Sequence, residues 1–235
     1  MPDIDPRKIV IFTGAGVSAE SGLSTFRDAD GLWEDHRIED VASIGGWRRN
    51  PAQVLEFYNR RREEVIKAQP NAAHLAIAEL QDRYDTVVIT QNVDDLHERA
   101  GSSQVLHLHG QILKSRSSVV PSLVYDQNGA IELGDLCEQG HQLRPDIVWF
   151  GEQLGDLSTV VTHLKTAARV LVIGTSLNVQ PAAGLLKHGR FHAEKMVVGL
   201  EVAKIPFGYK FLRGRAAGLV PLITNAWLSG RRFNP

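Results

Sequence analysis

Side chains suited to acid–base chemistry follow two short apolar runs of the sequence. Gln91, Asn92 and Asp94 come directly after the run 86–90, and the run 105–109 ends at His109. Because parallel strands direct their carboxyl ends to one edge of a sheet, where α/β proteins bind ligands, we expect these side chains to share a site. Amide and carboxylate groups can orient a ligand there, and a neutral imidazole can accept a proton near neutral pH. The alternative is structural: Asn92 and Asp94 would cap the next helix, and His109 would be buried at a strand end.

A glycine-rich loop follows the first expected strand. The run 14–22 contains Gly14, Gly16 and Gly22, with Ser18 between them. Glycines permit a tight turn and a close approach of the main chain to a pyrophosphate, whose charge suits the N-terminus of a following helix. The spacing differs from the usual G-x-G-x-x-G pattern, so the alternative is a strand-to-helix turn without a ligand.

The elements that would position these groups alternate between strands and helices. Apolar runs indicate strands at 8–13, 86–90, 105–109, 146–150, 169–174 and 195–202. Helices are expected at 51–69 and 72–83, capped by Asn50 and Asn71, and at 157–168 and 182–188. Continuous apolar strands separated by helices are typical of a parallel sheet buried on both faces, which predicts an α/β fold with a doubly wound, Rossmann-like sheet.

Two stretches interrupt this alternation. Residues 20–49 are rich in Gly, Asp and Trp, and residues 111–142 show little helical periodicity. Each is long enough to be a lid or a small inserted module. We therefore expect one domain over residues 1–235, with a core of about 8–19, 71–110 and 143–230 and insertions at about 20–70 and 111–142. Leu75 and Leu80 are expected on the inner side of the helix 72–83.

Composition excludes several classes of protein. The 26 basic and 27 acidic residues leave a net charge of −1, which lacks the positive charge typical of a nucleic-acid coat. No apolar run approaches the roughly 20 residues that span a bilayer, and the first residues lack the apolar segment of a signal peptide. The single cysteine, Cys137, cannot form an internal disulfide. We expect a cytoplasmic protein that binds neither membranes nor nucleic acid directly. The sequence leaves its oligomeric state open, with a monomer as the default.

Five blocks of sequence, in the same order, resemble the sirtuins, a family of NAD-dependent protein deacylases. They lie at 14–27, 90–97, 107–110, 144–152 and 174–182. The resemblance implies that NAD is consumed as a co-substrate, that the partners are proteins with acylated lysines, and that the products are nicotinamide and 2′-O-acyl-ADP-ribose. It also implies that Asn92 orients the nicotinamide ribose, that Asp94 holds the carboxamide, and that His109 is the general base that deprotonates a ribose hydroxyl.

The resemblance assigns further contacts by position in the matched blocks. It implies NAD contacts for Gly14, Ala15, Gly16, Ser18, Glu20, Phe26, Arg27, Gln91, Gly174, Thr175, Ser176 and Glu201. Glu201 stands where the family usually has an asparagine, so the alternative for it is a solvent-facing carboxylate at a strand end. Val148, Phe150, Gly151 and Glu152 resemble the segment that pairs with the substrate main chain, with a buried strand and turn as the alternative.

Tyr58 and Arg61 are three residues apart and share one face of the helix 51–69. This pair resembles the acyl-binding signature of the desuccinylase-type sirtuins. A guanidinium and a phenol suit a carboxylate at the far end of the acyl group, which predicts succinyl or malonyl substrates. The pair favours these groups without excluding acetyl-lysine. The alternative is that residues 60–64 form a solvated charged face.

The sequence departs from the family at the zinc site, where most sirtuins have four cysteines. Ser117 stands where the first is expected, and Cys137 and His141 supply two ligands at most, with Asp135 and Glu138 as poor candidates. Structural zinc sites need four nitrogen or sulfur ligands, so we expect no zinc. Packing would then hold the module, through the apolar side chains of Val119, Val120, Leu123, Val124, Ile131, Leu133 and Leu136.

Two other functions are compatible with the same motifs. One is ADP-ribosyl transfer or NAD hydrolysis through Asn92 and His109, and the other is a non-catalytic module that senses NAD or ADP-ribose. The segment 150–152 and the pair Tyr58 and Arg61 favour a deacylase, because neither alternative needs them. The joint presence of Asn92, Asp94 and His109 argues against an inactive site.

Overall fold

The computed structural model describes residues 3–25, 32–33 and 36–234. Its larger sheet has six parallel strands in the order β11-β10-β9-β1-β4-β5. The strands are β1 (Asp5–Thr13), β4 (Asp85–Thr90), β5 (Val105–His107), β9 (Ala167–Ile173), β10 (Glu194–Gly199) and β11 (Lys210–Arg213). The chain leaves β1 on one side through β4 and β5 and returns on the other side through β9. The strand order therefore reverses at β1, and such a reversal opens a crevice at the carboxyl ends of the strands.

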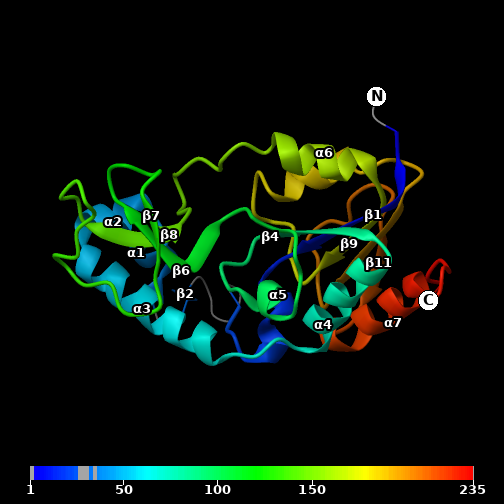
Figure 1. Ribbon diagram of the computed structural model, residues 1–235, viewed down its shortest axis with the longest axis horizontal. Coiled ribbons are helices and arrows are strands. Elements are labelled where there is room, and N and C mark those ends of the chain that lie inside the picture. The colour runs from blue at the N-terminus through cyan, green and yellow to red at the C-terminus, as the bar shows by residue number, and fades with distance from the viewer. Residues whose placement is uncertain (1–2, 26–31, 34–35, 235) are drawn as a thin grey trace.

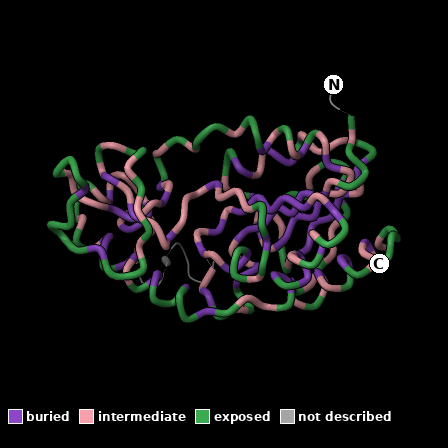
Figure 2. Tube along the Cα trace, viewed as in Figure 1, coloured by how far each residue is buried: buried purple, intermediate pink, exposed green. Residues whose placement is uncertain are grey.

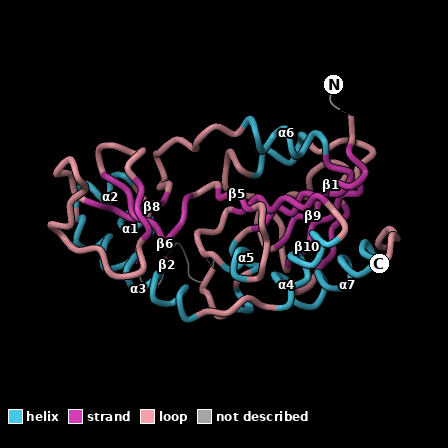
Figure 3. Tube along the Cα trace, in the orientation of Figure 1, coloured by secondary structure: helices cyan, strands magenta, loops and turns pink. Residues whose placement is uncertain are grey.

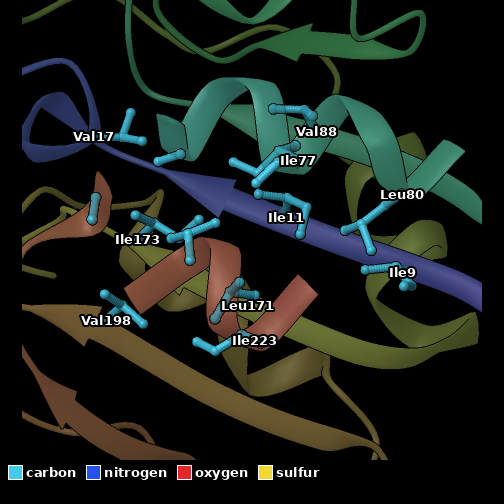
Figure 4. Packing of buried hydrophobic residues seen from close by; sticks show 14 of the residues in the cluster. Ile9, Ile11, Val17, Ile77, Leu80, Val88, Leu171, Ile173, Val198 and Ile223 are labelled. Atoms are coloured by element: carbon cyan, nitrogen blue, oxygen red, sulfur yellow. The ribbon is translucent and has the colours of Figure 1, made fainter. Parts of the chain in front are cut away.

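Helices cover both faces of this sheet (Figure 1). On one face lie α4 (Ala72–Glu79) and α7 (Ala216–Leu228), and on the other lie α6 (Ser158–Thr166) and the 3₁₀-helix η4 (Ala183–His188). Ile9 and Ile11 pack toward α4 and α7 (Figure 4), whereas Val10 and Phe12 pack on the opposite face. All four side chains are fully buried. The doubly wound α/β prediction is confirmed.

A smaller lobe stands at one end of the molecule (Figure 3). It contains the antiparallel sheet β7-β6-β8, formed by β6 (Gly110–Ser117), β7 (Val124–Asp126) and β8 (Leu143–Ile147). The helices α1 (Ile38–Val41), α2 (Ile44–Arg49) and α3 (Pro51–Lys67) pack beside it, and the short strands β2 (Leu32–Trp33) and β3 (His36–Arg37) precede them. We call α1–α3 with β6–β8 the small lobe, and residues 111–142 the module.

The remaining elements are short. The 3₁₀-helices η1 (Ala15–Val17) and η2 (Ala19–Ser21) follow β1, η3 (Leu80–Asp82) extends α4, and α5 (Leu96–Arg99) follows β4. Asn50 and Asn71 cap α3 and α4 as expected, because their side chains accept hydrogen bonds from Gln53 N and Ala73 N. Among the described helices, none is long and apolar enough to cross a membrane.

Three expectations about these elements are wrong or incomplete. The strand expected at 146–150 runs from Leu143 to Ile147 and pairs with β6 in the small sheet, because β5 leads almost directly into β6 and brings that strand beside it. Leu75 is 49% exposed, although Leu80 is buried as expected. The strand β11 and the helix α7 are not among the elements expected from the sequence; Gly218 and Pro221 interrupt the helical pattern of α7.

The module is held by polar contacts more than by the packing we expected. Figure 2 shows buried residues concentrated along the strands of the large sheet and mostly exposed loops in the module. Val119, Val124, Leu133 and Leu136 are 42–61% exposed, so the packing expectation is wrong for them. Ile131 is fully buried, and its main-chain N–H and C=O both bond to the side-chain amide of Asn59 on α3, at 2.9 and 3.0 Å. Arg62, also buried, donates to Asn59 Oδ1 and Ile112 O.

Candidate active site

A cavity of about 970 Å³ opens where the carboxyl ends of β1, β4, β9 and β10 face the small lobe. This volume is typical of a site for a cofactor-sized ligand. The cavity wall brings together almost every residue that the sequence singles out: Gly14, Ala15, Gly16, Ser18, Glu20, Tyr58, Arg61, Gln91, Asn92, Asp94, His109, Val148, Phe150, Gly151, Glu152, Gly174, Thr175, Ser176 and Glu201. Phe26 and Arg27 lie outside the described residues.

The glycine loop crosses the end of β9 with main chain against main chain. Gly14 N donates to Ile173 O at 2.9 Å, and Gly16 N donates to Gly174 O at 2.8 Å. A Cβ atom on Gly16 would lie 2.8 Å from Gly174 Cα. Gly174 has φ +62°, and a Cβ atom there would lie 2.3 Å from Val17 N. Only glycine permits this crossing, which fixes the loop at the mouth of the crevice.

Ser18, Asn92 and Asp94 form a hydrogen-bonded group on the cavity wall. The Ser18 hydroxyl donates to Asp94 Oδ2 at 3.0 Å and accepts from Asn92 Nδ2 at 3.1 Å. Burial raises the pKa of Asp94, and the hydrogen bonds from Leu96 N and Ser18 partly oppose that rise. Asn92 Oδ1 is buried and has no hydrogen-bond partner in the described part of the chain. Such an acceptor is costly unless a ligand hydroxyl or water satisfies it.

Two buried, neutral histidines lie next to this group: His74 contacts Ser18, and His97 contacts His74. His74 Nε2 lies 3.4 Å from Ser18 Oγ, and its ring meets that of His97 at 4.8 Å between centroids. Burial lowers the pKa of His74 to about 4 and also lowers the pKa of His97. His97 Nε2 bonds to Thr13 Oγ1 on β1 at 3.1 Å. The helix α5 therefore turns the ring of His97 back toward the sheet.

His109 stands at the cavity with one ring nitrogen fixed. Nδ1 lies 3.0 Å from Gln91 O, and a carbonyl oxygen only accepts, so Nδ1 carries the proton and a neutral ring has its lone pair on Nε2. Burial lowers the pKa of His109, although the Gln91 bond opposes this. Gln91 Nε2 in turn donates to Thr175 Oγ1 at 3.1 Å. The ring is therefore oriented and neutral at pH 7, as a general base must be.

Glu20 and Ser176 also have structural contacts. Glu20 Oε2 accepts a hydrogen bond from Ala217 N at 2.9 Å, at the start of α7. Ser176 Oγ accepts from Asn178 N at 3.3 Å. Glu201 is exposed and lines the cavity where β10 ends. Glu20 and Ser176 therefore line the cavity and also accept hydrogen bonds from the main chain.

Tyr58 and Arg61 are buried on the small-lobe side of the same cavity. Arg61 Nη1 donates to Ser24 Oγ at 2.7 Å and lies 2.8 Å from Glu64 Oε2. The indole N–H of Trp149 donates to the Tyr58 hydroxyl oxygen at 3.0 Å. Burial raises the pKa of Tyr58, so the phenol stays neutral. Arg61 is 6% exposed, which argues against a solvated face for this residue.

Glu152 anchors the segment that follows β8. Arg144 donates to both of its carboxylate oxygens, at 2.7 and 2.9 Å, and Trp149 N donates to Oε2 at 2.8 Å. Arg144 Cζ also lies 3.4 Å from the centroid of the Trp149 ring. Val148 N donates to His109 O, and Phe150 N donates to Ala42 O, each at 2.9 Å. The main-chain N–H groups of Val148 and Phe150 are therefore already bonded within the protein, and a substrate main chain would have to pair with other main-chain groups of this segment.

Comparison with known proteins identifies the family. The model of the Sir2 family matches residues 14–181, well over half of the chain. The chain belongs to the Sir2 family. The matched residues include the glycine loop, His109 and the Glu152 segment, and they end at Pro181 on the cavity wall.

Bacterial proteins called NAD-dependent protein deacylase are among the Sir2 relatives. One from Helicobacter pylori is 56% identical over 182 residues, which cover 77% of this chain and 80% of that protein. One from Vibrio cholerae is 44% identical over 234 residues, which cover 96% of this chain and 95% of that protein. A solved Sir2 homolog–NAD complex is 37% identical with a TM-score of 0.83, covering 95% and 90% of the two chains. A Sir2 protein bound to acetylated peptide is 27% identical with a TM-score of 0.79, covering 95% and 94%.

The residues of this Sir2 chain fit NAD. The glycine loop lines the cavity with Gly14, Ala15 and Gly16, where main-chain groups can approach phosphates, and Asn92 Oδ1 offers a buried acceptor to a hydroxyl group. Zinc does not fit in the same way. Across the described residues, which include the whole module, no group of three or more His, Cys, Asp or Glu side chains could hold a metal. Cys137 Sγ instead lies 3.5 Å from Ser117 Oγ, which accepts from Val119 N and Val120 N.

Sequence reasoning missed three residues of this Sir2 site. Trp149 and Arg144 lie within a matched block, but nothing in the sequence shows that one contacts Tyr58 and the other Glu152. The third is His107, whose Nδ1 donates to the main-chain oxygen of Asn92 at 2.9 Å. Trp149 and Tyr58 are 91 positions apart, whereas Arg144 lies 8 positions from Glu152 and His107 lies 15 from Asn92. The helix and strand periodicities of the sequence signal none of these three contacts.

Proposed function

We propose that this Sir2 protein is an NAD-dependent protein-lysine deacylase that removes succinyl, malonyl and acetyl groups. One observation carries the proposal: Tyr58 and Arg61 line the same cavity as Asn92 and His109. A site for NAD chemistry and a cation for an acidic acyl group therefore share one enclosure. The chemistry that NAD supplies is a ribose–nicotinamide bond that breaks when the oxygen of the acyl-lysine amide attacks the ribose.

The residues of the sheet edge bind NAD and move the proton. Asn92 offers Oδ1 to the nicotinamide ribose, and Asp94, held by Ser18, is placed to receive the carboxamide. His109, with Nδ1 fixed by Gln91 O, accepts a ribose hydroxyl proton at Nε2 once nicotinamide has left. The amide oxygen is a weak nucleophile, so much of the rate must come from holding the reactants in line and away from water.

The small lobe binds the acyl group. A buried guanidinium attracts a carboxylate, and one charge-assisted contact is worth about 1.5–3 kcal/mol, or roughly 10- to 150-fold in preference. Arg61 is already 2.8 Å from Glu64, whose side chain is about half exposed, so an acidic acyl group must share the guanidinium with it. This sharing reduces the preference for acidic groups and is the reason we include acetyl-lysine.

Protein substrates and location complete the proposal. The acylated lysine belongs to a protein whose chain lies beside residues 148–152 at the cavity mouth. We propose that the enzyme works as a monomer in the cytoplasm, where a chain with one cysteine is suited to the reducing conditions.

The test is mass spectrometry of succinylated, malonylated and acetylated peptides with and without NAD. We expect all three to be deacylated only with NAD, giving nicotinamide and 2′-O-acyl-ADP-ribose. Arg61→Met should lower desuccinylation far more than deacetylation, whereas Arg60→Met, an exposed neighbour on α3, should lower neither. Equal losses with Arg61→Met would contradict the acyl preference. Loss of NAD without deacylation would favour ADP-ribosyl transfer or NAD hydrolysis, and no reaction would favour a sensing module.

A further inference from the structure

His107 lies behind the cavity and bridges two groups that can only accept hydrogen bonds. Its Nδ1 is 2.9 Å from Asn92 O, and its Nε2 is 2.7 Å from Glu98 Oε1 on α5. A neutral imidazole has one N–H, whereas a carbonyl oxygen and a carboxylate both require a donor. Either His107 is an imidazolium or the Glu98 carboxyl carries the additional proton.

The surroundings favour the imidazolium. Asp94 in the loop after β4 and Asp146 on β8 add negative charge near His107, while Lys114 on β6 acts on Glu98 and His97 on α5 is held neutral. Burial lowers the pKa of His107, but the hydrogen bond and charge of Glu98, with Asn92 O and Asp94, outweigh it and raise the pKa above its ordinary value. Burial raises the pKa of Glu98, but its hydrogen bond to His107, the charge of that ring and Lys114 together outweigh burial and lower it. Both directions place the proton on the ring.

The bridge fixes the main chain at Asn92. Three bonds hold this turn: His107 Nδ1 to Asn92 O, Asn92 N to Thr90 Oγ1 at 3.0 Å, and Ile112 N to Val93 O at 2.8 Å. Without its second proton, His107 would present a lone pair either to the Glu98 carboxylate or to Asn92 O. Either tautomer breaks one of the two bonds and repels its former acceptor, so the ring would no longer tie Glu98 to Asn92.

We infer that His107 is a positioning residue that must be protonated for deacylation, because the imidazolium ties Glu98 to the main chain of Asn92. This inference rests on the proposed role of Asn92. The two histidines of this segment then need opposite protonation states: His107 must be protonated, whereas His109 must be neutral to accept a proton. Deacylation would then require a pH above the pKa of His109 and below that of His107.

The direct test is ¹⁵N NMR of histidine-labelled full-length protein without NAD or peptide. His107→Gln identifies the signals by their loss. We expect both ring nitrogens of His107 to be protonated at pH 7 and to titrate above the ordinary histidine range. A lone-pair signal from either nitrogen at pH 7 would overturn the inference. This measurement does not depend on activity, so it separates failure of the inference from failure of the proposed function.

The second test is the pH profile of deacylation between pH 6 and 9. We expect kcat/KM to fall on the alkaline side with a limiting slope of about tenfold per pH unit. In Glu98→Gln the side-chain amide can donate to a neutral His107 Nε2, so Nδ1–H stays on Asn92 O and the alkaline fall should disappear. Glu79→Gln, an exposed carboxylate on α4, is the control and should keep the wild-type profile. An unchanged alkaline fall in Glu98→Gln, or none in the wild type, would overturn the inference.

Discussion

His107 and His109 stand on either side of the buried Leu108, yet their rings meet partners of opposite character. His107 Nε2 lies 2.7 Å from a carboxylate oxygen of Glu98, whereas His109 has its Nδ1 on a main-chain oxygen, Gln91 O, at 3.0 Å. The carboxylate raises the pKa of His107, and burial lowers the pKa of His109. Pairs of titratable groups pushed apart in this way are typical of sites that do acid–base chemistry.

His109→Gln should remove the proposed general base. We expect kcat for deacylation to fall by about 10²–10⁴-fold. Exchange of free nicotinamide into NAD, in the presence of acylated peptide, should persist because His109 acts after nicotinamide leaves. Radiolabelled nicotinamide measures the exchange, and His192→Gln, an exposed histidine, is the control. In the wild type, activity should fall as pH drops through a pKa below 6.5. Equal loss of exchange and deacylation in His109→Gln would contradict this role.

Trp149→Phe should reduce acyl selectivity. Phenylalanine keeps an aromatic ring beside Arg144, but the N–H that donates to the Tyr58 oxygen is lost. We expect desuccinylation to weaken more than deacetylation, by about 1 kcal/mol or roughly fivefold. A double-mutant cycle with Tyr58→Phe measures the coupling, because the second change should add little once the bond is gone. Fully additive effects would show that the bond has no role in selectivity.

Glu152→Gln should lower stability at neutral pH and flatten its dependence on acid. Burial raises the pKa of Glu152, but Arg144, Trp149 N and Arg116 lower it more, so its pKa in the folded state is below the ordinary value of 4.5. Its contribution is therefore present above pH 4.5 and is lost as pH falls through the folded pKa. Urea unfolding measured from pH 3 to 7 should show that the free energy of unfolding depends less on pH in the variant than in the wild type. Glu132→Gln, an exposed carboxylate of the module, should behave as wild type.

Asn59→Ala should loosen the module. The side-chain amide of Asn59 makes both main-chain bonds to Ile131 and accepts from the buried Arg62. Loss of these partners should cost about 1–3 kcal/mol. Limited proteolysis should then cut within residues 111–142 sooner than in the wild type. The matched control, Asn128→Ala, removes an exposed amide of the same module. Equal cleavage rates for the two variants would show that the Asn59 contact does not hold the module.

Treatment with a zinc chelator should not change the thermal stability of this protein. The ligands of a structural site are missing among the described residues, and the module is fastened through Asn59 and Arg62 instead. We expect the same thermal midpoint with and without a strong chelator. Metal analysis of purified protein provides the second measurement, and about one zinc per chain would contradict the prediction.

Local patterns were enough to predict most strands of the large sheet and the glycine loop that follows β1. The runs 9–12 and 87–89 are apolar throughout because both faces of these strands are buried. Asn50 and Asn71 begin helices because their side chains satisfy free N–H groups nearby. Gly16 and Gly174 signal a close approach without revealing that they approach each other. Each of these signals depends on a residue and its near neighbours in sequence.

What the sequence determined by itself was the set of chemical groups: the glycine loop, the amide, carboxylate and imidazole after two strands, and the missing cysteines. The tertiary structure alone decided their partners. It moved residues 143–147 into the small sheet, sent His97 to Thr13, joined Trp149 to Tyr58 and placed Glu98 against His107. The physical reason is that hydrogen bonding and charge act through space. A pattern in sequence specifies which groups are available, and only the folded chain brings a donor within 3 Å of its acceptor.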